Sequence, residues 1–228
     1  MNGSNCEALK DALGRPLKDL RISVTDRCNF RCSYCMPLEK YEWIDRREIL
    51  TFEEITRLAG IFVRLGVEEV RLTGGEPLLR HGLDSLIEKL SGIGGLKDLS
   101  LTTNASLLSE QAPLLVQAGL KRINASLDTI NPDKFRDITR RDDLDNVLQG
   151  LFAAARCGLN PIKINSVIQR GVNDEDIPEL TAFARKHGFW IRFVEFMDVG
   201  NSNNWVSDRM ISKKEILEII NRQFPLEE

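Results

Sequence analysis

Three cysteines lie close together at Cys28, Cys32 and Cys35, directly after a strand-like run. Because the spacing C-x3-C-x2-C is short, the three sulfurs can converge on one small group without help from a distant part of the chain. Thiolates suit soft metals and iron–sulfur clusters, and a cubane cluster has four irons. The pattern therefore predicts a 4Fe–4S cluster held at three corners, whose remaining iron has an open position for chemistry.

The same cysteines have other interpretations. A structural zinc site would need a fourth Cys or His nearby, and the histidines of the chain are His81 and His187. A disulfide framework is typical of short, cysteine-dense secreted chains rather than of 228 residues with five cysteines. Inert buried thiols are a third interpretation, but the residues between the cysteines include polar ones, which is untypical of a hydrophobic core. Cys157 stands alone in an apolar helix-like run, where packing is its expected role.

From residue 20 onward a short β-rich run alternates repeatedly with a longer helical one. Such alternation predicts parallel strands joined by crossover helices. Six units, against eight in a complete barrel, predict an α/β fold with a partial (β/α)6 TIM-like barrel, and a doubly wound open sheet is the alternative. The expected strands are residues 20–25, 69–73, 98–102, 122–127, 162–167 and 191–196, and the expected helices are residues 51–65, 83–90, 110–118, 144–156, 177–187 and 213–222.

Local signals mark the ends of several expected helices. Thr51 with Glu54, and Ser212 with Glu215, fit capping boxes. Glycines that can adopt a left-handed conformation follow four helical runs, at Gly66, Gly119, Gly158 and Gly188. Because Gly and Pro are spread evenly, we expect one domain over residues 19–228, preceded by an N-terminal segment, residues 1–18.

Each expected strand separates apolar from polar residues by alternation. Helices outside a barrel cover the apolar face, so the polar face would line the lumen, where a packed barrel carries Val, Ile and Leu. Cations there would be costly to bury unpaired, and Arg suits bidentate contact with phosphate. An antiparallel sheet with one solvated face would also show alternating polar and apolar residues, although the helices between the expected strands make antiparallel pairing difficult. The pattern predicts a cavity for an anion such as a triphosphate, with four cations, Arg21, Arg71, Lys163 and Arg192.

Composition narrows the class of protein further. With 42% apolar residues the chain can bury one large core, and a net charge of −3 does not indicate a nucleic-acid-binding protein. No apolar run approaches the ~20 residues that span a bilayer, so we expect no membrane association. Residues 1–18 are charged and lack the apolar stretch of a signal peptide, which predicts a cytoplasmic protein.

A second motif, Gly74-Gly75-Glu76-Pro77, follows the second expected strand. Two glycines allow the backbone to approach a ligand closely. Such a turn alone is a weak signal, since Gly- and Pro-containing turns are common. It becomes informative in a chain that also carries the three-cysteine segment.

Together these motifs resemble the radical S-adenosylmethionine (SAM) superfamily, and within it the GTP 3′,8-cyclase family of molybdenum-cofactor biosynthesis. The resemblance rests on LRISVTDRC over residues 20–28, on CMP over residues 35–37 and on RLTGGEP over residues 71–77, and extends from about Arg15 to the last residues. It implies a partial barrel, a 4Fe–4S cluster and SAM as cofactors, GTP as substrate and a separate electron donor. It also implies that no side chain serves as a nucleophile.

The resemblance assigns roles residue by residue. Cys28, Cys32 and Cys35 would bind the cluster. Positions matching SAM contacts are Tyr34, Gly75, Ser126 and Met197. Positions matching GTP contacts are Arg21, Arg71, Thr102 and Lys163, with Arg192 beside them. Without the resemblance, Met197 would be an ordinary core residue, and Thr102 and Ser126 ordinary strand residues.

The resemblance is incomplete at the C-terminus. Cyclases of that family continue to a second cysteine triad that holds another cluster against the guanine, whereas this sequence reaches Glu228 without one. We therefore expect either a shortened form or a cyclase-like protein that works differently, with apolar surface exposed at the open flank and a possible homo-oligomer. The alternative functions are another radical SAM enzyme, such as a peptide maturase, and a non-catalytic cluster-binding barrel.

Overall fold

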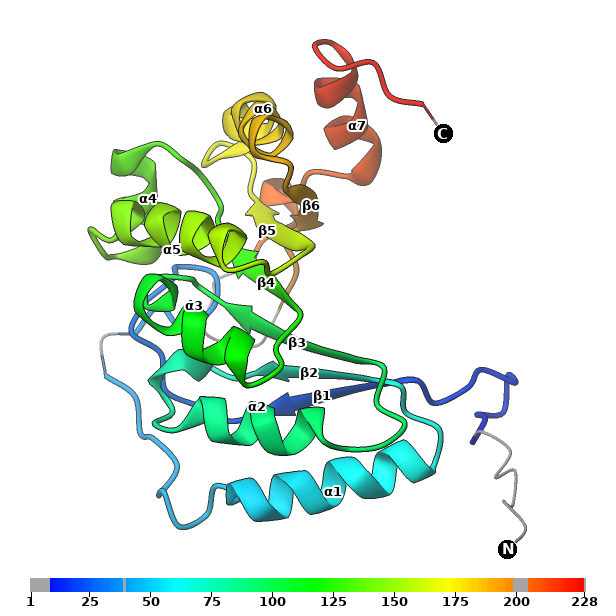
Figure 1. The fold of residues 1–228 in the computed structure, drawn as a ribbon. Coiled ribbons are helices and arrows are strands. Elements are labelled where there is room, and N and C mark those ends of the chain that lie inside the picture. Colours follow the sequence, from blue (N-terminus) through cyan, green and yellow to red (C-terminus); the bar gives the residue numbers. More distant parts are fainter. Residues whose placement is uncertain (1–8, 39, 199–204, 228) are drawn as a thin grey trace, which may run out of the picture.

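The computed structural model describes residues 9–38, 40–198 and 205–227. These form a six-stranded parallel sheet whose strands follow chain order from β1 to β6 (Figure 1). The strands are β1 (Asp19–Ser23), β2 (Glu69–Thr73), β3 (Asp98–Thr103), β4 (Arg122–Ser126), β5 (Ile162–Ile168) and β6 (Trp190–Glu195). A doubly wound sheet reverses its order at a switch point, whereas a partial barrel keeps chain order. The partial-barrel prediction is confirmed.

Helices follow the strands and lie in an arc outside the sheet (Figure 1). They are α1 (Phe52–Arg64), α2 (Leu83–Ser91), α3 (Leu108–Gln117), α4 (Pro132–Thr139), α5 (Leu144–Arg156), α6 (Ile177–His187) and α7 (Lys213–Asn221). Both predicted capping boxes are present. The four glycines predicted to end helices have φ between 70° and 112°.

Helix α4 is an element that the sequence interpretation missed. Its cap is Asn131, whose side chain accepts hydrogen bonds from the amides of Asp133 and Lys134, and Pro132 opens its first turn. An Asn cap followed by Pro is a recognised start signal, but the helix has only eight residues and therefore shows little periodicity. It ends at Arg140, in the left-handed region with φ 55°.

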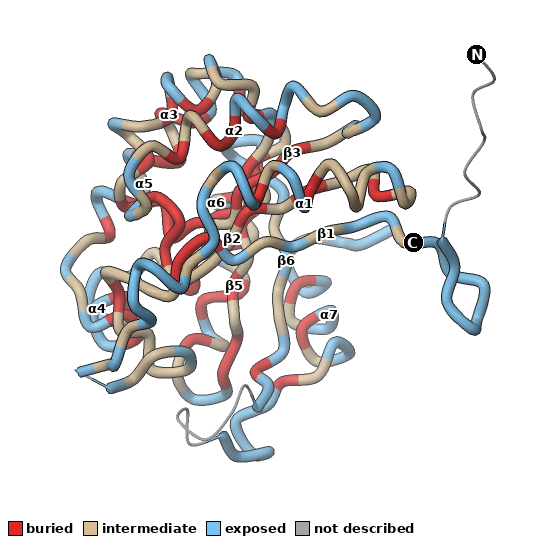
Figure 2. Tube along the Cα trace, turned by 90° about the horizontal axis from the view of Figure 1, so that it is seen from below, coloured by how far each residue is buried: buried red, intermediate tan, exposed pale blue. Residues whose placement is uncertain are grey.

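The hydrophobic core lies between the sheet and these helices, where buried residues concentrate in Figure 2. In β2, Val70 and Leu72 are fully buried, whereas Arg71 and Thr73 on the opposite face are only partly covered. This is the alternation predicted from the sequence, and it directs the polar face into the barrel. None of the helices in the described part of the chain is long and apolar enough to cross a membrane.

Beyond β5 the sheet ends at β6, and apolar side chains are exposed on this strand and after it. Trp190 is 61% exposed, and Trp205, Val206 and Met210 are also open to solvent. These side chains are exposed one by one, and a continuous apolar surface with association through it stays a prediction. The boundary between residues 1–18 and the barrel also stays a prediction, because residues 1–8 lie outside the described part.

Candidate functional site

The three cysteines border one cavity at the carboxyl ends of the strands. This cavity of about 210 Å³ is lined by all three, together with Gly74 and Gly75. A hollow of about 300 Å³ shares these five lining residues. Among the described residues no three His, Cys, Asp or Glu side chains are grouped for a single metal ion. All three cysteines nevertheless border both spaces.

The cysteine segment is held by main-chain contacts with the end of α4. The amides of Arg31 and Ser33 donate to the carbonyls of Thr139 and Ile138, at 3.0 and 2.8 Å. Next to α4, Arg141 donates from Nε to the Asn29 carbonyl at 2.7 Å. These bonds fix the backbone between Cys28 and Cys35, so α4 is part of the site's framework.

Arg31 braces the segment from within. Its guanidinium donates to the carbonyls of Cys28 and Phe30, both at 2.8 Å. The same group lies 5.5 and 5.6 Å from the ring centres of Tyr41 and Trp43. Because stacking and hydrogen bonding act together, the turn after Cys28 is stabilised in one conformation.

All three thiols are harder to ionise than an ordinary cysteine. Burial raises the pKa of each, and it does so most strongly for Cys32. The carboxylate of Asp128 raises the pKa of Cys32 further. Without a positively charged partner the thiols therefore stay protonated, and a group that binds them must displace protons.

The Gly74-Gly75-Glu76 turn presses against the chain just before Cys28. The amide of Gly75 donates to the Thr25 carbonyl and that of Glu76 to the Arg27 carbonyl, both at 2.7 Å. A Cβ at Gly74 would collide with the Thr25 carbonyl, and one at Gly75 with the Arg27 carbonyl. Gly74 also has φ +154°, which side chains rarely adopt. Glycine is therefore required at both positions.

Glu76 links this turn to the end of β3. Its buried carboxylate accepts hydrogen bonds from Thr103 Oγ1 at 2.7 Å and from the amide of Asn104 at 2.6 Å. Burial raises the pKa of Glu76. The Asn104 side chain then donates to Asn29 Oδ1 at 2.9 Å, which reaches the cysteine segment. The two motifs are thus connected through three buried or partly buried polar side chains that sequence reasoning did not assign.

Tyr34 is anchored by an acid at the end of β4. Its hydroxyl donates to Asp128 Oδ2 at 2.7 Å, and Oδ1 of the same carboxylate accepts from the amide of Val167 at 2.8 Å. Burial raises the pKa of Asp128 to about 6. Tyr34, Gly75, Ser126 and also Thr102 line the cavity of about 210 Å³. Met197 is not among the residues that line it, and is 56% exposed beyond β6.

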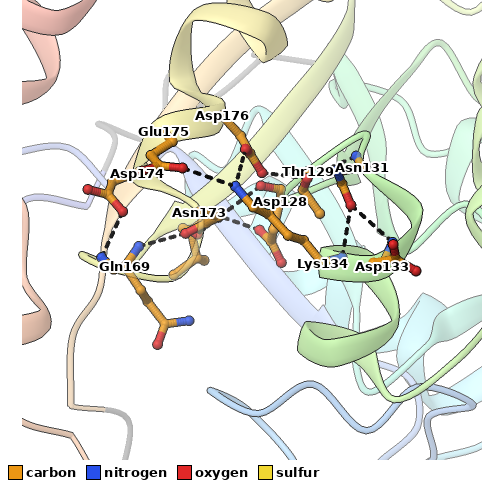
Figure 3. A network of polar contacts seen from close by, with 12 residues as sticks. Asp128, Thr129, Asn131, Asp133, Lys134, Gln169, Asn173, Asp174, Glu175 and Asp176 are labelled. Atoms are coloured by element: carbon orange, nitrogen blue, oxygen red, sulfur yellow. Dashed lines mark hydrogen bonds and ion pairs between the residues drawn. The ribbon is translucent and has the colours of Figure 1, made fainter.

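A polar network behind Asp128 fixes the ends of β4 and β5 (Figure 3). Asn173 donates to the carbonyls of Asp128 and Val167, at 2.8 and 2.9 Å. The carboxylate of Asp176 accepts from Thr129 Oγ1 and from Lys134 Nζ, both at 2.6 Å. Since Lys134 belongs to α4, this network also ties that helix to the sheet.

The predicted cations come together inside the barrel. Arg21 is paired in register with Arg71, and Arg192 with Asn165. Burial lowers the pKa of Arg71, and the charges of Arg21, Arg122 and Arg192 lower it further. Burial and then the same kind of repulsion lower the pKa of Lys163, which lies 4.7 Å from the Trp190 ring centre. The structure thus groups all four predicted cations.

Arg122 is a fifth cation of this group, which the sequence interpretation did not include. It forms ion pairs with Asp98 and, at 3.4 Å, with Glu69. The alternation of Arg122, Asn124 and Ser126 along β4 is the signal that could have identified it.

Several buried polar atoms of the lumen lack a hydrogen-bond partner within the described residues. Buried polar groups in proteins almost always have such a partner. A space of about 220 Å³ lies against Arg21, Arg71 and Ser100, and the carboxylates of Asp19 and Glu69 border it as well. The unpartnered atoms suit a polar occupant, and the grouped cations favour an anionic one. The unpartnered atoms are Arg71 Nε, Ser100 Oγ, Arg122 Nη1, Asn124 Nδ2 and Oδ1, and Asn165 Oδ1.

Residues 22–184 match the model of the Radical SAM superfamily. The chain belongs to this superfamily. Membership implies a 4Fe–4S cluster and SAM as cofactors. The fold is similar to that of a solved structure, SuiB of Streptococcus suis bound to S-adenosylmethionine, which superposes with a TM-score of 0.72 over 89% of this chain and 46% of its own, at 18% identity.

Two curated relatives are much closer in sequence. The GTP 3′,8-cyclase of Acidothermus cellulolyticus is 52% identical over 97% of this chain and 62% of its own length. The GTP 3′,8-cyclase of Staphylococcus aureus (strain JH9) is 48% identical over 97% of this chain and 66% of its own length. This chain thus spans less than two thirds of the length of each of these relatives.

Proposed function

We propose that this chain is the catalytic core of a radical SAM lyase that cyclises GTP to (8S)-3′,8-cyclo-7,8-dihydroguanosine 5′-triphosphate in molybdenum-cofactor biosynthesis. The observation that carries the proposal is the 52% identity to a GTP 3′,8-cyclase, combined with a barrel lumen that gathers five cations. We expect it to act in the cytoplasm with an external electron donor and without nucleic acid.

The donor set fits a 4Fe–4S cluster. Cys28, Cys32 and Cys35 border one cavity, and cysteine thiolates are the ligands that hold iron–sulfur clusters. When bound, such a cluster supplies the single electron that divides SAM into methionine and a 5′-deoxyadenosyl radical. Next to the thiols, Gly75 offers backbone without a side chain, and Tyr34 and Ser126 border the same space. We assign these residues, with Met197, to SAM.

The barrel lumen supplies the substrate's contacts. We assign Arg21, Arg71, Lys163 and Arg192 to the triphosphate, because they are grouped and carry charges that lower one another's pKa or that of a neighbour. Thr102 borders the cavity at the cysteines and can orient the nucleoside. The task of these residues is to hold ribose and cofactor in register and to exclude water from a reactive radical.

Release of 5′-deoxyadenosine from SAM tests the enzyme assignment. The purified chain is reconstituted without oxygen, its iron and sulfide are measured, and a strong reductant is added with SAM. We expect 5′-deoxyadenosine to form. A fully loaded cluster that leaves SAM intact would identify a non-catalytic cluster-binding barrel, and turnover of a peptide but not of GTP would favour a maturase.

Variants of the lumen test the substrate assignment separately. Arg21→Ala and Lys163→Ala should each weaken GTP binding about tenfold or more, since each removes a charged phosphate contact. Binding of SAM should stay near normal, because neither residue lines the cavity at the cysteines. Equal loss of both ligands would mean a folding defect rather than a lost phosphate contact.

A further inference from the structure

A second cationic cavity lies outside the barrel, close to the cysteine segment. It has a volume of about 260 Å³ and is lined by Arg27, Arg46, Arg80 and His81, together with Val24, Thr25, Ile49 and Leu79. We refer to it as the arginine cavity. None of the triphosphate or SAM positions assigned above lines it, so it is separate from the proposed active site.

The arginines of this cavity have no carboxylate partner in direct contact among the described residues. None of Arg27, Arg46 and Arg80 forms an ion pair in the part of the chain that the structure describes, although nearby Asp45 pairs with Arg47. Arg80 donates instead to the carbonyls of Val24 and Leu50, and its guanidinium lies 4.4 Å from the Phe52 ring centre. Neutral partners hold this guanidinium in place and leave its charge uncompensated.

The arginine cavity and the space at the thiols lie on two sides of one short segment. Thr25 lines both, and Asp26 faces the thiol side. Arg27, which lines the cavity, directly precedes Cys28 and accepts from the amide of Glu76 with its carbonyl. Positive charge is therefore concentrated where the cysteine segment meets solvent, on a chain whose net charge is −3.

We propose that the arginine cavity is the docking point for an acidic one-electron donor protein, which places a surface carboxylate among Arg27, Arg46 and His81. This inference rests on the proposed function, because that function needs one electron from outside the chain. The donor, a reduced flavin or iron–sulfur protein, is oxidised by one electron and the cluster is reduced by one. An acidic partner is repelled by the chain as a whole, so this local positive region decides where it binds.

The lining of the cavity suits a single carboxylate. Three arginines and a histidine border a space of about 260 Å³, which can admit an anionic side chain. The position of the cavity beside the cysteine segment favours the carboxylate of a redox partner.

Cluster reduction in stopped flow tests the proposal with the reconstituted chain and an acidic flavodoxin reduced to its hydroquinone. No SAM or GTP is added, so a failure of GTP cyclisation does not affect the result. We expect Arg46→Glu and His81→Glu each to slow reduction about tenfold. Raising NaCl from about 50 to about 300 mM should slow the wild type more than Arg46→Glu, because salt screens the attraction.

Two controls make the test decisive. Arg156→Glu reverses the charge of another exposed arginine, on α5, and should leave the rate unchanged. Reduction by dithionite needs no docking and should be equal in all variants. Equal rates for Arg46→Glu and Arg156→Glu with flavodoxin would overturn the proposal, as would an equal slowing with dithionite. Inorganic phosphate bound by the wild type but not by Arg46→Glu, with flavodoxin rates unchanged, would identify a small-anion site instead.

Discussion

The four free cysteines of the described chain have different surroundings, which separate Cys157 from Cys28, Cys32 and Cys35. The three border a common cavity, whereas Cys157 caps the end of α5 and packs against the core. Cys32→Ala should therefore abolish cluster binding, and Cys157→Ala should retain it, as measured by iron and sulfide content after reconstitution. An intact cluster in Cys32→Ala would contradict the ligand assignment.

Asp128 predicts an unusual dependence of stability on pH. Its pKa is about 6 in the folded chain, against an ordinary value of 3.8. Between these values the unfolded chain has released a proton that the folded chain keeps, so the stability of the metal-free chain falls as pH rises through that window, by at most about 3 kcal/mol. The loss levels off about one pH unit above the folded-state pKa.

The Asp128→Asn variant removes this titration. Urea unfolding of the metal-free chain at about pH 4.5 and about pH 7 should show that wild type loses more stability than the variant between the two. Other carboxylates titrate equally in both proteins and cancel in the comparison. The same change in both proteins would mean that Asp128 is already ionised at the lower pH.

At the scale of elements, α4 shows where sequence reasoning stops. The six strands and the long helices were predictable because their apolar periodicity extends over many residues. Helix α4 is short, and its importance comes from long-range hydrogen bonds. The carbonyls of Thr139 and Ile138 accept from the amides of Arg31 and Ser33, which are distant in the sequence. The structural roles of Glu76 and Asp128 were not predicted for the same reason, because the burial of these carboxylates depends on how the ends of the strands meet. Arg122, by contrast, lies on the polar face of a strand, so the alternation pattern could have identified it as a lumen residue.

Helix α4 can be tested as a support of the cysteine segment. Asn131→Ala removes its cap and should cost about 1 kcal/mol of stability. Thr51→Ala is a matched control, because it removes a cap of similar strength from α1. We expect a chelator to extract iron from reconstituted Asn131→Ala several times faster than from Thr51→Ala. Equal extraction rates at equal stability would show that α4 does not protect the site.

At the scale of the whole molecule, the barrel lumen contains both positive and negative side chains. Five cations face the lumen, and Asp98 and Glu69 hold one of them, Arg122. Side-chain exposures of 13% for Arg122 and 22% for Asp98 place this pair where screening by water is weak. Arg122 therefore masks acidic groups that would otherwise repel a triphosphate.

This balance predicts how GTP binding responds to a pair of substitutions. Arg122→Gln removes one cation and unmasks Asp98, so GTP affinity in calorimetry should fall well beyond tenfold. Asp98→Asn in the same chain removes the unmasked charge and should restore part of the affinity, which makes the two effects non-additive. Guanosine carries no phosphate and should bind all variants alike. If the double variant binds GTP no better than Arg122→Gln, then Asp98 does not face the triphosphate, and Arg122 contributes only as a contact.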